Sequence, residues 1–411
     1  MASGAAVYPE AMLPFDEARA RLLDGVAVVP SERVSLWQAA GRVLAEDLRA
    51  VTPLPPFAAS AMDGYAVALD SLVGDGPWQL PVSGESRAGS PPDALPSGTS
   101  LRIFTGAPLP PGADTVIMQE VVERAGDVVT LRTRPRRGEH VRGAGEDLAA
   151  DAVGLERGSR LGPAQLSLAA MLDRAEVVVA RRPRVVILAT GNELRRPGSA
   201  PSPATIPESN APGLAALALQ AGADVSLAPP CTDDAAATTA AITEALRGAD
   251  LVVTIGGVSV GDHDVVRPSL ERAGVSLDFW RVAIKPGKPL AVGRRGDTRV
   301  LGLPGNPVSA LVTFSLFGLP LLRAMQGDRR PLPTPIRLPL GQRITRQPGR
   351  LEFVRAAIEP RASGVHVVPL RNQASGAMVS LARCDALAVL PLDATELAEG
   401  TPIDTLRLGD L

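Results

Sequence analysis

The sequence has few cysteines and no long uninterrupted apolar run, the features that mark secreted disulfide-rich, zinc-binding and membrane-spanning proteins. Its two cysteines, Cys231 and Cys384, lie far apart and in no CxxC or Cys/His grouping. This excludes a disulfide framework or a zinc cluster and suits a reducing compartment. The longest apolar run, from Val308 to Leu322, is too short and too often interrupted to predict a membrane span. Because no basic segment precedes an apolar run at the N-terminus, we expect a cytoplasmic protein without a secretory signal.

The chain also has no large excess of charge of either sign. The formal net charge is -2, which gives no general attraction to nucleic acid or to anionic membranes, so we expect neither as a partner and infer that any anion binding is local. Lysine is nearly absent: of 42 basic residues only Lys285 and Lys288 are lysines, both in IKPGKPL. A lysine ammonium is a compact point charge, unlike the planar arginine fork. Its confinement to one segment favours an anion-binding role over chance clustering.

The length predicts several domains. At 411 residues the chain exceeds the size at which one hydrophobic core stops growing. A helix is expected from Phe15 to Leu23 and a second from Leu36 to Leu44. From Thr52 to about Val141, short β-like runs punctuated by Gly and Pro predict a small β-rich domain inserted into the chain. A further helix is expected from Pro163 to Asp173.

The segment from Arg184 to Met325 predicts an α/β domain. Strands are expected at 185–189, 224–227, 250–255, 280–284, 289–292 and 300–303, and helices at 211–221, 234–246, 265–273 and 308–325. Strands that alternate with helices of this length indicate βαβ units, hence a parallel sheet with helices on both faces. After the Pro-rich linker at 329–335, five short apolar runs predict a small C-terminal β-barrel or sandwich.

Four polar loops follow the ends of these strands. They are TGNEL (190–194), GGVSVGDHD (256–264), KPGKP (285–289) and PGNPVS (304–309). Ligands of open parallel sheets bind beyond the carboxyl ends of the strands. Gly256, Gly257 and Gly261 leave room for backbone N–H donors to approach an anion, and Asn306 followed by Pro307 is typical of a helix start with free N–H groups. Together the loops predict a phosphate or nucleotide pocket.

Several of these side chains also have a purely structural interpretation. Asp262 and Asp264 can cap the following helix, although the pair is also compatible with Mg²⁺ bound together with ligand phosphates. His263 is expected to be a surface residue. Glu193 can be a solvated loop residue, and Asn306 a cap and not a catalyst. The two lysines are the hardest to explain in this way.

The motifs together resemble one family. SAMDGYAV (60–67), RIFTGAPLPPGAD (102–114), GEDL (145–148), TGNEL, GGVSVGDHD, AIKPGKPLAVG (283–293) and GLPGNPVSALVTF (302–314) occur in this order. As a set they resemble the molybdopterin molybdenumtransferases, which include the E domain of gephyrin. The resemblance covers residues from about 13 to 380.

This resemblance implies a multi-domain α/β plus β fold and an elongated homodimer. The implied parts are a helical/mixed connector (27–50 and 142–175), the β-rich inserted domain (51–141), a molybdopterin-binding-like α/β/α domain with a parallel sheet (1–26 and 176–328) and a C-terminal β-barrel (329–411). The implied active cleft lies between the α/β domain of one subunit and the inserted domain of the other.

The resemblance also implies the reaction: molybdate and adenylylated molybdopterin give molybdenum cofactor and AMP, assisted by Mg²⁺. Such chemistry mainly requires positioning and neutralisation of negative charge. The implied catalytic residues are Asp63, Glu193, Asp264, Lys285 and Lys288, with Asp264, Asp63 and Glu193 as metal ligands. The implied substrate-binding residues are Thr105, Glu146, Thr190, Asp234, Gly256, Gly257, Ser259, Pro304, Gly305, Asn306, Pro307, Arg350, Arg355 and Ser375.

The sequence departs from the family pattern at Ala58 and Ala59, where many members carry Asp-Asn, at Asn192, where Asp is common, and at Glu208 of ESN. Two other functions stay open at this point. A molybdopterin adenylyltransferase shares the α/β fold, and fold alone does not fix function; a binding scaffold, as gephyrin also is, would need partner domains for which the sequence gives no sign. Implied partners are the molybdopterin adenylyltransferase and cofactor-accepting enzymes. The sequence does not distinguish molybdate from tungstate as the substrate.

Overall fold

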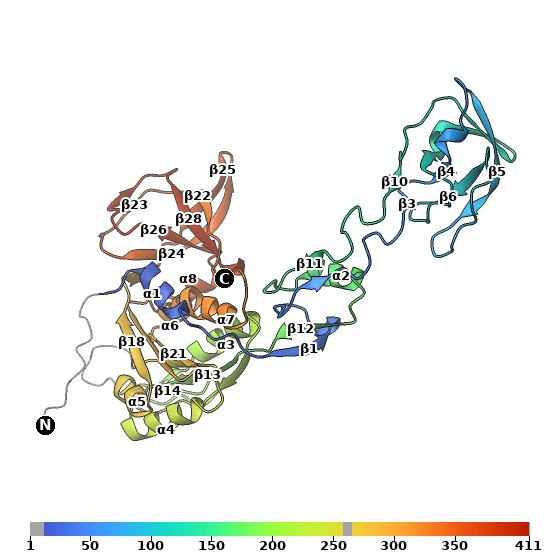
Figure 1. Cartoon of the computed structure of the whole chain (residues 1–411). Helices are drawn as coiled ribbons and strands as arrows, with labels where there is room; N and C mark the ends of the chain where they lie inside the picture. The colour runs from blue at the N-terminus through green and yellow to red at the C-terminus, as the bar shows by residue number, and fades with distance from the viewer. Residues whose placement is uncertain (1–11, 258–264, 411) are drawn as a thin grey trace.

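The computed structural model describes residues 12–257 and 265–410 and shows an elongated molecule (Figure 1). An α/β sheet with its helices and a C-terminal sheet lie at one end. A small connector forms the middle, and a β-rich insertion forms the far end. The chain passes through the connector twice, on its way to the insertion and on its way back.

The α/β part is built on a six-stranded sheet in the order β16-β13-β17-β21-β20-β18. Its strands are β13 (Arg184–Ala189), β16 (Asp224–Leu227), β17 (Leu251–Ile255), β18 (Ser276–Arg281), β20 (Pro289–Arg295) and β21 (Thr298–Leu303). Four of them, β16, β13, β17 and β21, are parallel, as the sequence predicted. The prediction of a parallel sheet is wrong for β20, which runs antiparallel to both of its neighbours, β21 and β18. Only two residues separate β20 from β21, and so short a loop can join only antiparallel strands.

Helices cover both faces of this sheet. They are α3 (Asn210–Gln220), α4 (Ala235–Ala245), α5 (Val266–Arg272) and the continuous stretch of α6 (Pro307–Thr313), η4 (Phe314–Gly318) and α7 (Leu319–Met325), with α1 (Phe15–Leu23) against α7. Alternation along β13 explains the two layers: Ile187 faces the cluster under α3 and α6, whereas Leu188 faces the cluster under α4 and α5. Short pairs β14 (Leu194–Arg195) and β15 (Ile206–Pro207) flank the strand ends.

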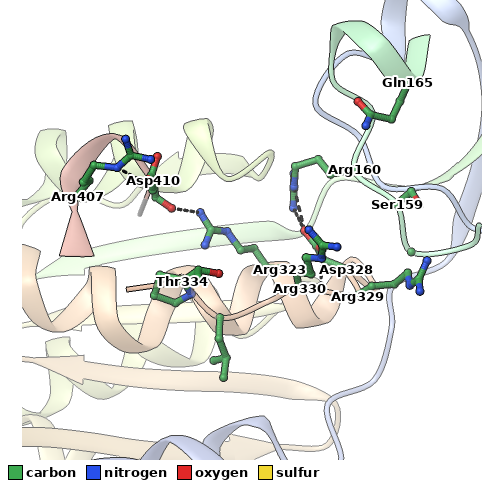
Figure 2. A pocket seen from close by; sticks show the side chains of 13 residues that line it. Ser159, Arg160, Gln165, Arg323, Asp328, Arg329, Arg330, Thr334, Arg407 and Asp410 are labelled. Carbon is green, nitrogen blue, oxygen red and sulfur yellow. Dashed lines mark hydrogen bonds and ion pairs between the residues drawn. The ribbon is translucent and has the colours of Figure 1, made fainter. Parts of the chain in front are cut away.

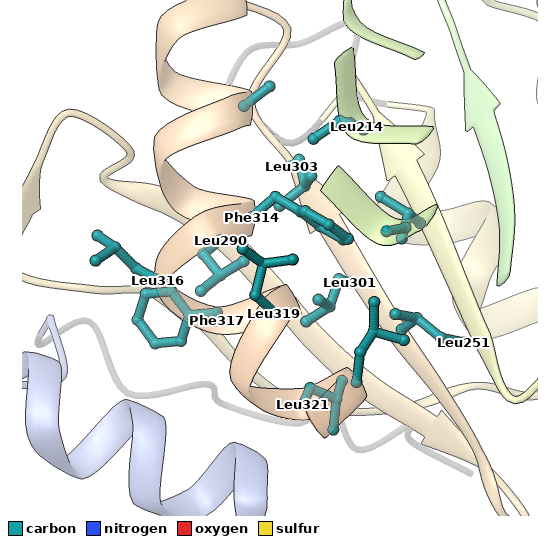
Figure 3. Close-up of a cluster of buried hydrophobic side chains, with 14 of the residues drawn as sticks. Leu214, Leu251, Leu290, Leu301, Leu303, Phe314, Leu316, Phe317, Leu319 and Leu321 are labelled. Carbon is teal, nitrogen blue, oxygen red and sulfur yellow. The ribbon is translucent and has the colours of Figure 1, made fainter. Parts of the chain in front are cut away.

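The stretch Pro307–Met325 has the length and mean hydropathy (1.6) of a membrane span, but 83% of it is buried inside the protein. Among the described residues it is the one helix with these properties. Figure 3 shows Phe314, Phe317 and Leu321 from this helix packed with Leu290 and Leu301 of the sheet. Burial against protein explains the apolar composition, which is that of a core helix.

The connector packs around its own small core. It contains β1 (Ser31–Ser35), η1 (Leu36–Gln38), β2 (Leu48–Arg49), β11 (Val153–Leu155), α2 (Pro163–Met171) and β12 (Glu176–Ala180). β12 pairs with β1, and its Val177 and Val179 pack in the connector core; the domain bounds stay predictions. The predicted helix from Leu36 to Leu44 is wrong: only a 3₁₀ turn forms, since Gly41 has a φ of 73° and Val43 then bridges to Arg160.

The insertion is a separate β unit. Its six-stranded sheet has the order β7-β4-β6-β5-β9-β8. The strands are β3 (Ala59–Ser60), β4 (Gly64–Val67), β5 (Trp78–Ser86), β6 (Ser100–Ile103), β7 (Thr115–Met118), β8 (Val122–Ala125), β9 (Val128–Leu131) and β10 (Val141–Arg142), with short turns η2 (Leu69–Ser71) and η3 (Gln119–Val121). β3 pairs with β10 at its base.

The C-terminal part is a sheet in the order β19-β24-β26-β28-β22, with β25 on β24. Its elements are β19 (Ile284–Lys285), β22 (Ile336–Pro339), β23 (Ile344–Thr345), β24 (Leu351–Arg361), β25 (Gly364–Pro369), α8 (Met378–Ala382), β26 (Ala386–Leu390), β27 (Glu396–Leu397), β28 (Pro402–Arg407) and η5 (Leu408–Asp410). A single isolated bridge, Leu340 to Val367, brings the β22 end next to β25. The closed β-barrel stays a prediction.

Candidate functional site

A cavity of 580 Å³ lies at the carboxyl ends of β13, β17 and β21. We call it the strand-end cavity. Its wall includes Thr190, Gly191, Glu193, Leu194, Ile206, Pro207, Glu208, Ser209, Asn210, Asp233, Ile255, Gly256, Gly257, Pro289, Pro304, Gly305, Asn306 and Pro307. Predicted site residues from three of the four loops therefore meet here, as the position of parallel strand ends requires.

Backbone glycines shape the floor of this cavity. Gly256 and Gly257 have φ values of 86° and 60°, in the region that disfavours residues with a Cβ. A Cβ on Gly256 would lie 2.7 Å from the carbonyl oxygen of Thr190, and one on Gly257 would collide with the side chain of Val266. The two glycines thus allow the chain to turn at the end of β17, next to Thr190 at the end of β13.

Two helices begin at the cavity wall. Asn306 occupies the N-cap position of α6 and Pro307 its first position, as predicted, but the Asn306 side chain makes no capping hydrogen bond. The backbone N–H of Val308 donates to the carbonyl oxygen of Ser375, 3.1 Å away. The sequence analysis had expected this N–H group to be free for a ligand. The predicted residue Ser375 therefore holds the C-terminal part against the start of α6.

The start of α3 supplies residues that the local sequence patterns did not single out. Glu208 Oε1 accepts from the backbone N–H groups of Asn210 and Ala211 at 2.7 and 2.9 Å. Asn210, 8% exposed, donates its Nδ2 to the carbonyl oxygen of Gly305, 2.7 Å away. Its Oδ1 is buried and has no hydrogen-bond partner among the described residues. Because an unpaired buried acceptor is costly, it is suited to accept from a ligand N–H or O–H group. The ESN motif before the helix was the one local signal for it.

Acidic side chains dominate the strand-end cavity. The described lining contains Glu193, Glu208 and Asp233 and no lysine or arginine. Asp233 faces Asn192, with mutual hydrogen bonds of 3.1 Å between each backbone N–H and the other's side-chain oxygen. Asp234, for which the family resemblance implies substrate binding, caps α4 by accepting from Ala237 N–H at 2.7 Å. Its neighbour Asp233 is the one of the two that lines the cavity, and substrate binding by Asp234 stays a prediction.

The KPGKP segment runs away from this cavity toward a second one. Lys285 lies in β19, which pairs in parallel with β24 and places Lys285 beside Glu352. The Nζ of Lys285 is 3.0 Å from Glu352 Oε1. Pro289, at the other end of the segment, lines the strand-end cavity. Four residues span at most about 14 Å, so the segment joins the two cavities over a short distance.

The second cavity, which we call the Lys285 cavity, has a volume of 550 Å³. Six basic side chains and the single carboxylate of Glu352 are among its described lining residues. The basic residues are Lys285, Arg343, Arg346, Arg350, Arg355 and Arg371. Glu352 also lies 3.4 Å from Arg346, so its charge is already matched by two cations. The cavity therefore keeps an excess of positive charge.

Arg355 is a buried residue in the wall of this cavity. It is 2% exposed, and its guanidinium donates to Ser380 Oγ and to the carbonyl oxygens of Asn372 and Ala374 at 2.9–3.1 Å. Burial lowers the pKa of this guanidinium below its usual value. Arg355 thus positions the loop that carries Ser375. Arg350 lines the cavity and forms no salt bridge to a described residue. Lys288 is exposed and likewise has no salt bridge to a described residue.

The sequence analysis predicted that both lysines, Gly257 and Asn306 would share one rim. The structure divides them: Gly257 and Asn306 line the strand-end cavity, and Lys285 lines the other. The missing signal was the pairing of β19 with β24, a contact between distant parts of the chain that no local pattern reveals. Ser259 and Asp264 lie outside the described residues.

Asp63 and Thr105 form a separate pair on the insertion. Asp63 Oδ1 accepts from the backbone N–H and the hydroxyl of Thr105 at 2.7 and 2.8 Å. The Thr105 backbone and hydroxyl hydrogen bonds, aided by the charge of Arg102, lower the pKa of the Asp63 carboxyl. Glu146 folds back onto Gly143 N–H, 2.9 Å away. Within one chain the insertion lies at the opposite end of the molecule from the sheet whose strand ends form the cavity (Figure 1), so Asp63 and Thr105 cannot complete the site of their own chain.

The strand-end cavity has the types of ligand that a hard cation takes together with phosphates. Carboxylate oxygens from Glu193 and Asp233, together with exposed backbone, are ligands that suit Mg²⁺, which takes one or two protein carboxylates plus ligand phosphates. Within residues 12–257 and 265–410, no group of three or more potential ligands occurs. Of the residues predicted to bind the metal, Glu193 is the one that lines the strand-end cavity in the described structure.

Comparisons with known proteins agree with the motifs. Residues 13–172 match the MoeA N-terminal region (domain I and II), residues 186–324 a probable molybdopterin binding domain, and residues 337–408 the MoeA C-terminal region (domain IV). The chain is 39% identical over 388 residues to molybdopterin molybdenumtransferase 2 of Mycobacterium tuberculosis, covering 91% of this chain and 94% of that one. The chain belongs to the molybdopterin molybdenumtransferase family.

Other members of the family give the same result. The Synechococcus elongatus molybdopterin molybdenumtransferase is 36% identical, with 97% of this chain and 100% of that one covered. A crystal structure of the molybdopterin biosynthesis MoeA protein from Pyrococcus horikoshii has a TM-score of 0.84 at 28% identity, covering 96% and 100%. The family resemblance and the expectation of an enzyme are confirmed, as is the multi-domain architecture in its coarse form. The roles of individual site residues stay predictions.

Proposed function

We propose that this protein inserts molybdate into adenylylated molybdopterin and releases AMP, in the biosynthesis of the molybdenum cofactor. The observation that carries the proposal is the pair of cavities joined by KPGKP. The strand-end cavity offers the unpaired Asn210 Oδ1, carboxylates and glycine backbone. The Lys285 cavity offers an excess of positive charge. The first environment can hold a heterocycle and, with Mg²⁺, its phosphates, and the second can hold a metal oxyanion.

The strand-end cavity holds the adenylylated molybdopterin. The Asn210 Oδ1 acceptor suits an N–H group of a heterocycle, and the backbone at Gly256 and Gly257 approaches the phosphates. Thr190, Pro304, Gly305, Asn306 and Pro307 form the surrounding wall. Mg²⁺ would be held by Glu193 and Asp264 together with Asp63 of a second subunit, and would draw negative charge from the bridging phosphates.

The Lys285 cavity gathers molybdate. Its oxyanion is attracted by Arg350 and by the surplus of basic side chains. Lys285 is held in place by Glu352. Lys288 directly precedes Pro289 of the strand-end cavity and carries an ammonium without an ion pair to described residues. Both lysines neutralise charge that accumulates when the phosphoanhydride bond breaks.

We further propose that the enzyme acts as a homodimer in which Asp63, Thr105 and Glu146 of one subunit complete the cavity of the other. Two features support this. The insertion cannot reach the strand-end cavity of its own chain (Figure 1), and the connector exposes Trp37 at 94% and Met171 at 58%. Large exposed apolar side chains of this kind mark interaction surfaces when they lie together. The two belong to η1 and α2, which contact each other.

The reaction needs supply and delivery of its substrates, so we propose the molybdopterin adenylyltransferase and cofactor-accepting enzymes as further partners and the cytoplasm as the compartment. The free thiols of Cys231 and Cys384 support a reducing environment. Burial raises the pKa of both thiols, which keeps them protonated and unreactive.

The test is AMP release by the purified protein incubated with adenylylated molybdopterin, Mg²⁺ and molybdate. Lys288→Ala should abolish turnover without loss of the folded dimer, and Lys288→Arg should not restore it, because a planar fork does not replace a point charge. Arg295→Ala, which removes an exposed cation at the far end of β20, is the matched control and should behave as the wild type.

Two outcomes would count against the proposal. Near-normal AMP release by Lys285→Ala or Lys288→Ala would remove the lysines from the mechanism. ATP-dependent adenylylation of free molybdopterin, with no molybdate-dependent AMP release, would support the adenylyltransferase instead.

A further inference from the structure

A third cavity lies away from both parts of the proposed site. This junction cavity has a volume of 530 Å³ and is formed where four segments meet (Figure 2). They are the connector before and within α2, the end of α7, the linker after it and the C-terminal turn. The lining residues are Gly158, Ser159, Arg160, Gln165, Arg323, Asp328, Arg329, Arg330, Leu332, Pro333, Thr334, Arg407 and Asp410.

The charge of this cavity is strongly one-sided. Five arginines and two aspartates line it, which gives a formal balance of 5 − 2 = +3. This contrasts with the whole chain, whose formal net charge is -2. Like charges brought together repel, so a cluster of this kind lowers its free energy by binding an anion.

Three of the arginines already have carboxylate partners. Arg160 Nε donates to Asp328 Oδ2, 3.0 Å away, Arg407 Nε donates to Asp410 Oδ2, 2.6 Å away, and Arg329 pairs with Glu156 outside the cavity. These pairs fix the walls. They leave the charges of the other two arginines unmatched.

Arg323 and Arg330 are those two. Arg323 donates only to the backbone carbonyl oxygen of Asp410, 3.2 Å away, and has no carboxylate within ion-pair distance among the described residues. Burial, and then the charge of Arg160, lower the pKa of the Arg323 guanidinium. The backbone N–H of Arg330 donates to Asp328 Oδ1, 2.9 Å away, whereas its guanidinium has no hydrogen-bond or ion-pair partner in the described part of the chain. Figure 2 shows Arg323 extending from α7 into the space between the C-terminal turn and the connector.

Neutral groups complete the lining. The hydroxyls of Ser159 and Thr334 and the amide of Gln165 can donate to phosphate oxygens. Leu332, 39% exposed, and Pro333 offer a small apolar wall. Arginines with neutral donors match the geometry of phosphate oxygens, and the volume is in the range of small-molecule sites.

We propose that the junction cavity binds a phosphorylated small molecule, held chiefly by Arg323 and Arg330. Its phosphate oxygens would bridge α7, the linker and the connector. The cavity shares no lining residue with the strand-end or Lys285 cavities, so this site is separate from the one proposed for catalysis. Its ligand would fix the connector against the α/β part.

The test is isothermal titration of the full-length protein with inorganic pyrophosphate. Arg323→Gln and Arg330→Gln should each weaken binding about tenfold or more, the loss expected for one charge-assisted hydrogen bond. Arg132→Gln, which changes an exposed arginine of the insertion, is the control and should leave affinity unchanged. Because Arg330 is exposed, its substitution tests the site without disturbing the core.

Two further variants distinguish binding at the junction from a loss of folding and from binding in the Lys285 cavity. Asp410→Asn removes a competing negative charge and should strengthen pyrophosphate binding, a gain that loss of structure cannot produce. The double variant Lys285→Ala/Lys288→Ala should retain binding at the junction. Unchanged affinity in both arginine variants, or complete loss in the lysine double variant, would overturn the proposal.

Discussion

Gly287 lies between the two lysines of KPGKP, and replacing it by alanine tests whether the shape of this segment governs activity. Its φ is 103°, and a Cβ built there would come closer than 3.0 Å to Thr313 Oγ1. Thr313 is fully buried in α6 and cannot swing into solvent. The substitution therefore imposes an unfavourable backbone conformation and a clash at once.

The magnitude follows from these two contributions. An unfavourable positive φ costs about 1–3 kcal/mol, and overpacking a filled site costs about 1–3 kcal/mol, so the total strain is about 2–6 kcal/mol. The segment can relieve part of it by moving away from α6. A displacement of about 1 Å of a positioning group can lower the rate by about a hundredfold. We therefore expect Gly287→Ala to lose most AMP release and also to lower Tm.

Controls separate the clash from the backbone effect. Gly296→Ala has a similar sign of φ (57°) but nothing within 4 Å of the added Cβ. It should lower Tm by a few degrees, from a cost of about 1–2 kcal/mol, and leave AMP release intact. In Gly287→Ala/Thr313→Ala the nearest remaining atoms lie at 3.3 and 3.4 Å, so activity should recover partly. A fully active Gly287→Ala, or no recovery in the double variant, would refute this reasoning.

Three more outcomes are expected. Asp63→Asn should slow AMP release by about a hundredfold without dissociating the proposed dimer in sedimentation, and unchanged kinetics would contradict a shared cavity. Trp37→Asp should raise the dimer Kd about 30-fold, a change of about 2 kcal/mol, measured by analytical ultracentrifugation; an unaffected Kd would place Trp37 outside the interface. Asp250→Asn should cost about 1–3 kcal/mol, because it breaks the pair with Arg181 at 2.6 and 2.7 Å.

The Asp250 variant also has a defined pH dependence. Burial alone would raise the pKa of Asp250, but hydrogen bonds from the Arg181 side chain and the Arg184 N–H, with the charges of both arginines, lower it below 3.8. A lowered carboxyl pKa contributes stability above its unfolded value, and that stability is lost as the pH falls through the folded pKa. The Tm difference between wild type and Asp250→Asn should therefore be constant above about pH 5 and shrink below pH 3.8. A difference that grows in acid would contradict this sign.

Local patterns predicted what depends on local structure. The helix at Phe15–Leu23 and the strand at Asp224–Leu227 have the predicted bounds, and the strand-end cavity lies where parallel strands end. One feature that depends on contacts between distant residues was missed. The pairing of Ile284 with Leu351 carries Lys285 into the C-terminal sheet, and no periodicity within either segment records this partnership.

The positions of Asp233 and Asp234 also depend on a detail that the sequence does not fix. Asp233 and Asp234 are adjacent acidic residues, and only the exact start of α4 decides which of them caps the helix and which faces the cavity. Helix starts are predicted from sequence to within a residue or two at best. Asn210 was overlooked because its unpaired oxygen is a property of packing against Gly305, which the sequence does not contain.

The antiparallel contact of β3 with β10 sets Ser60 opposite Val141, so the chain departs for the insertion and returns at neighbouring points about 5 Å apart. A tight two-residue turn could join them in place of residues 61–140. The excised piece keeps its own apolar cluster around Tyr65 and Trp78. The insertion can thus be removed as a unit. A shortened chain without it keeps the three cavities but lacks Asp63 and Thr105, so ligand binding in the cavities can be measured without these groups.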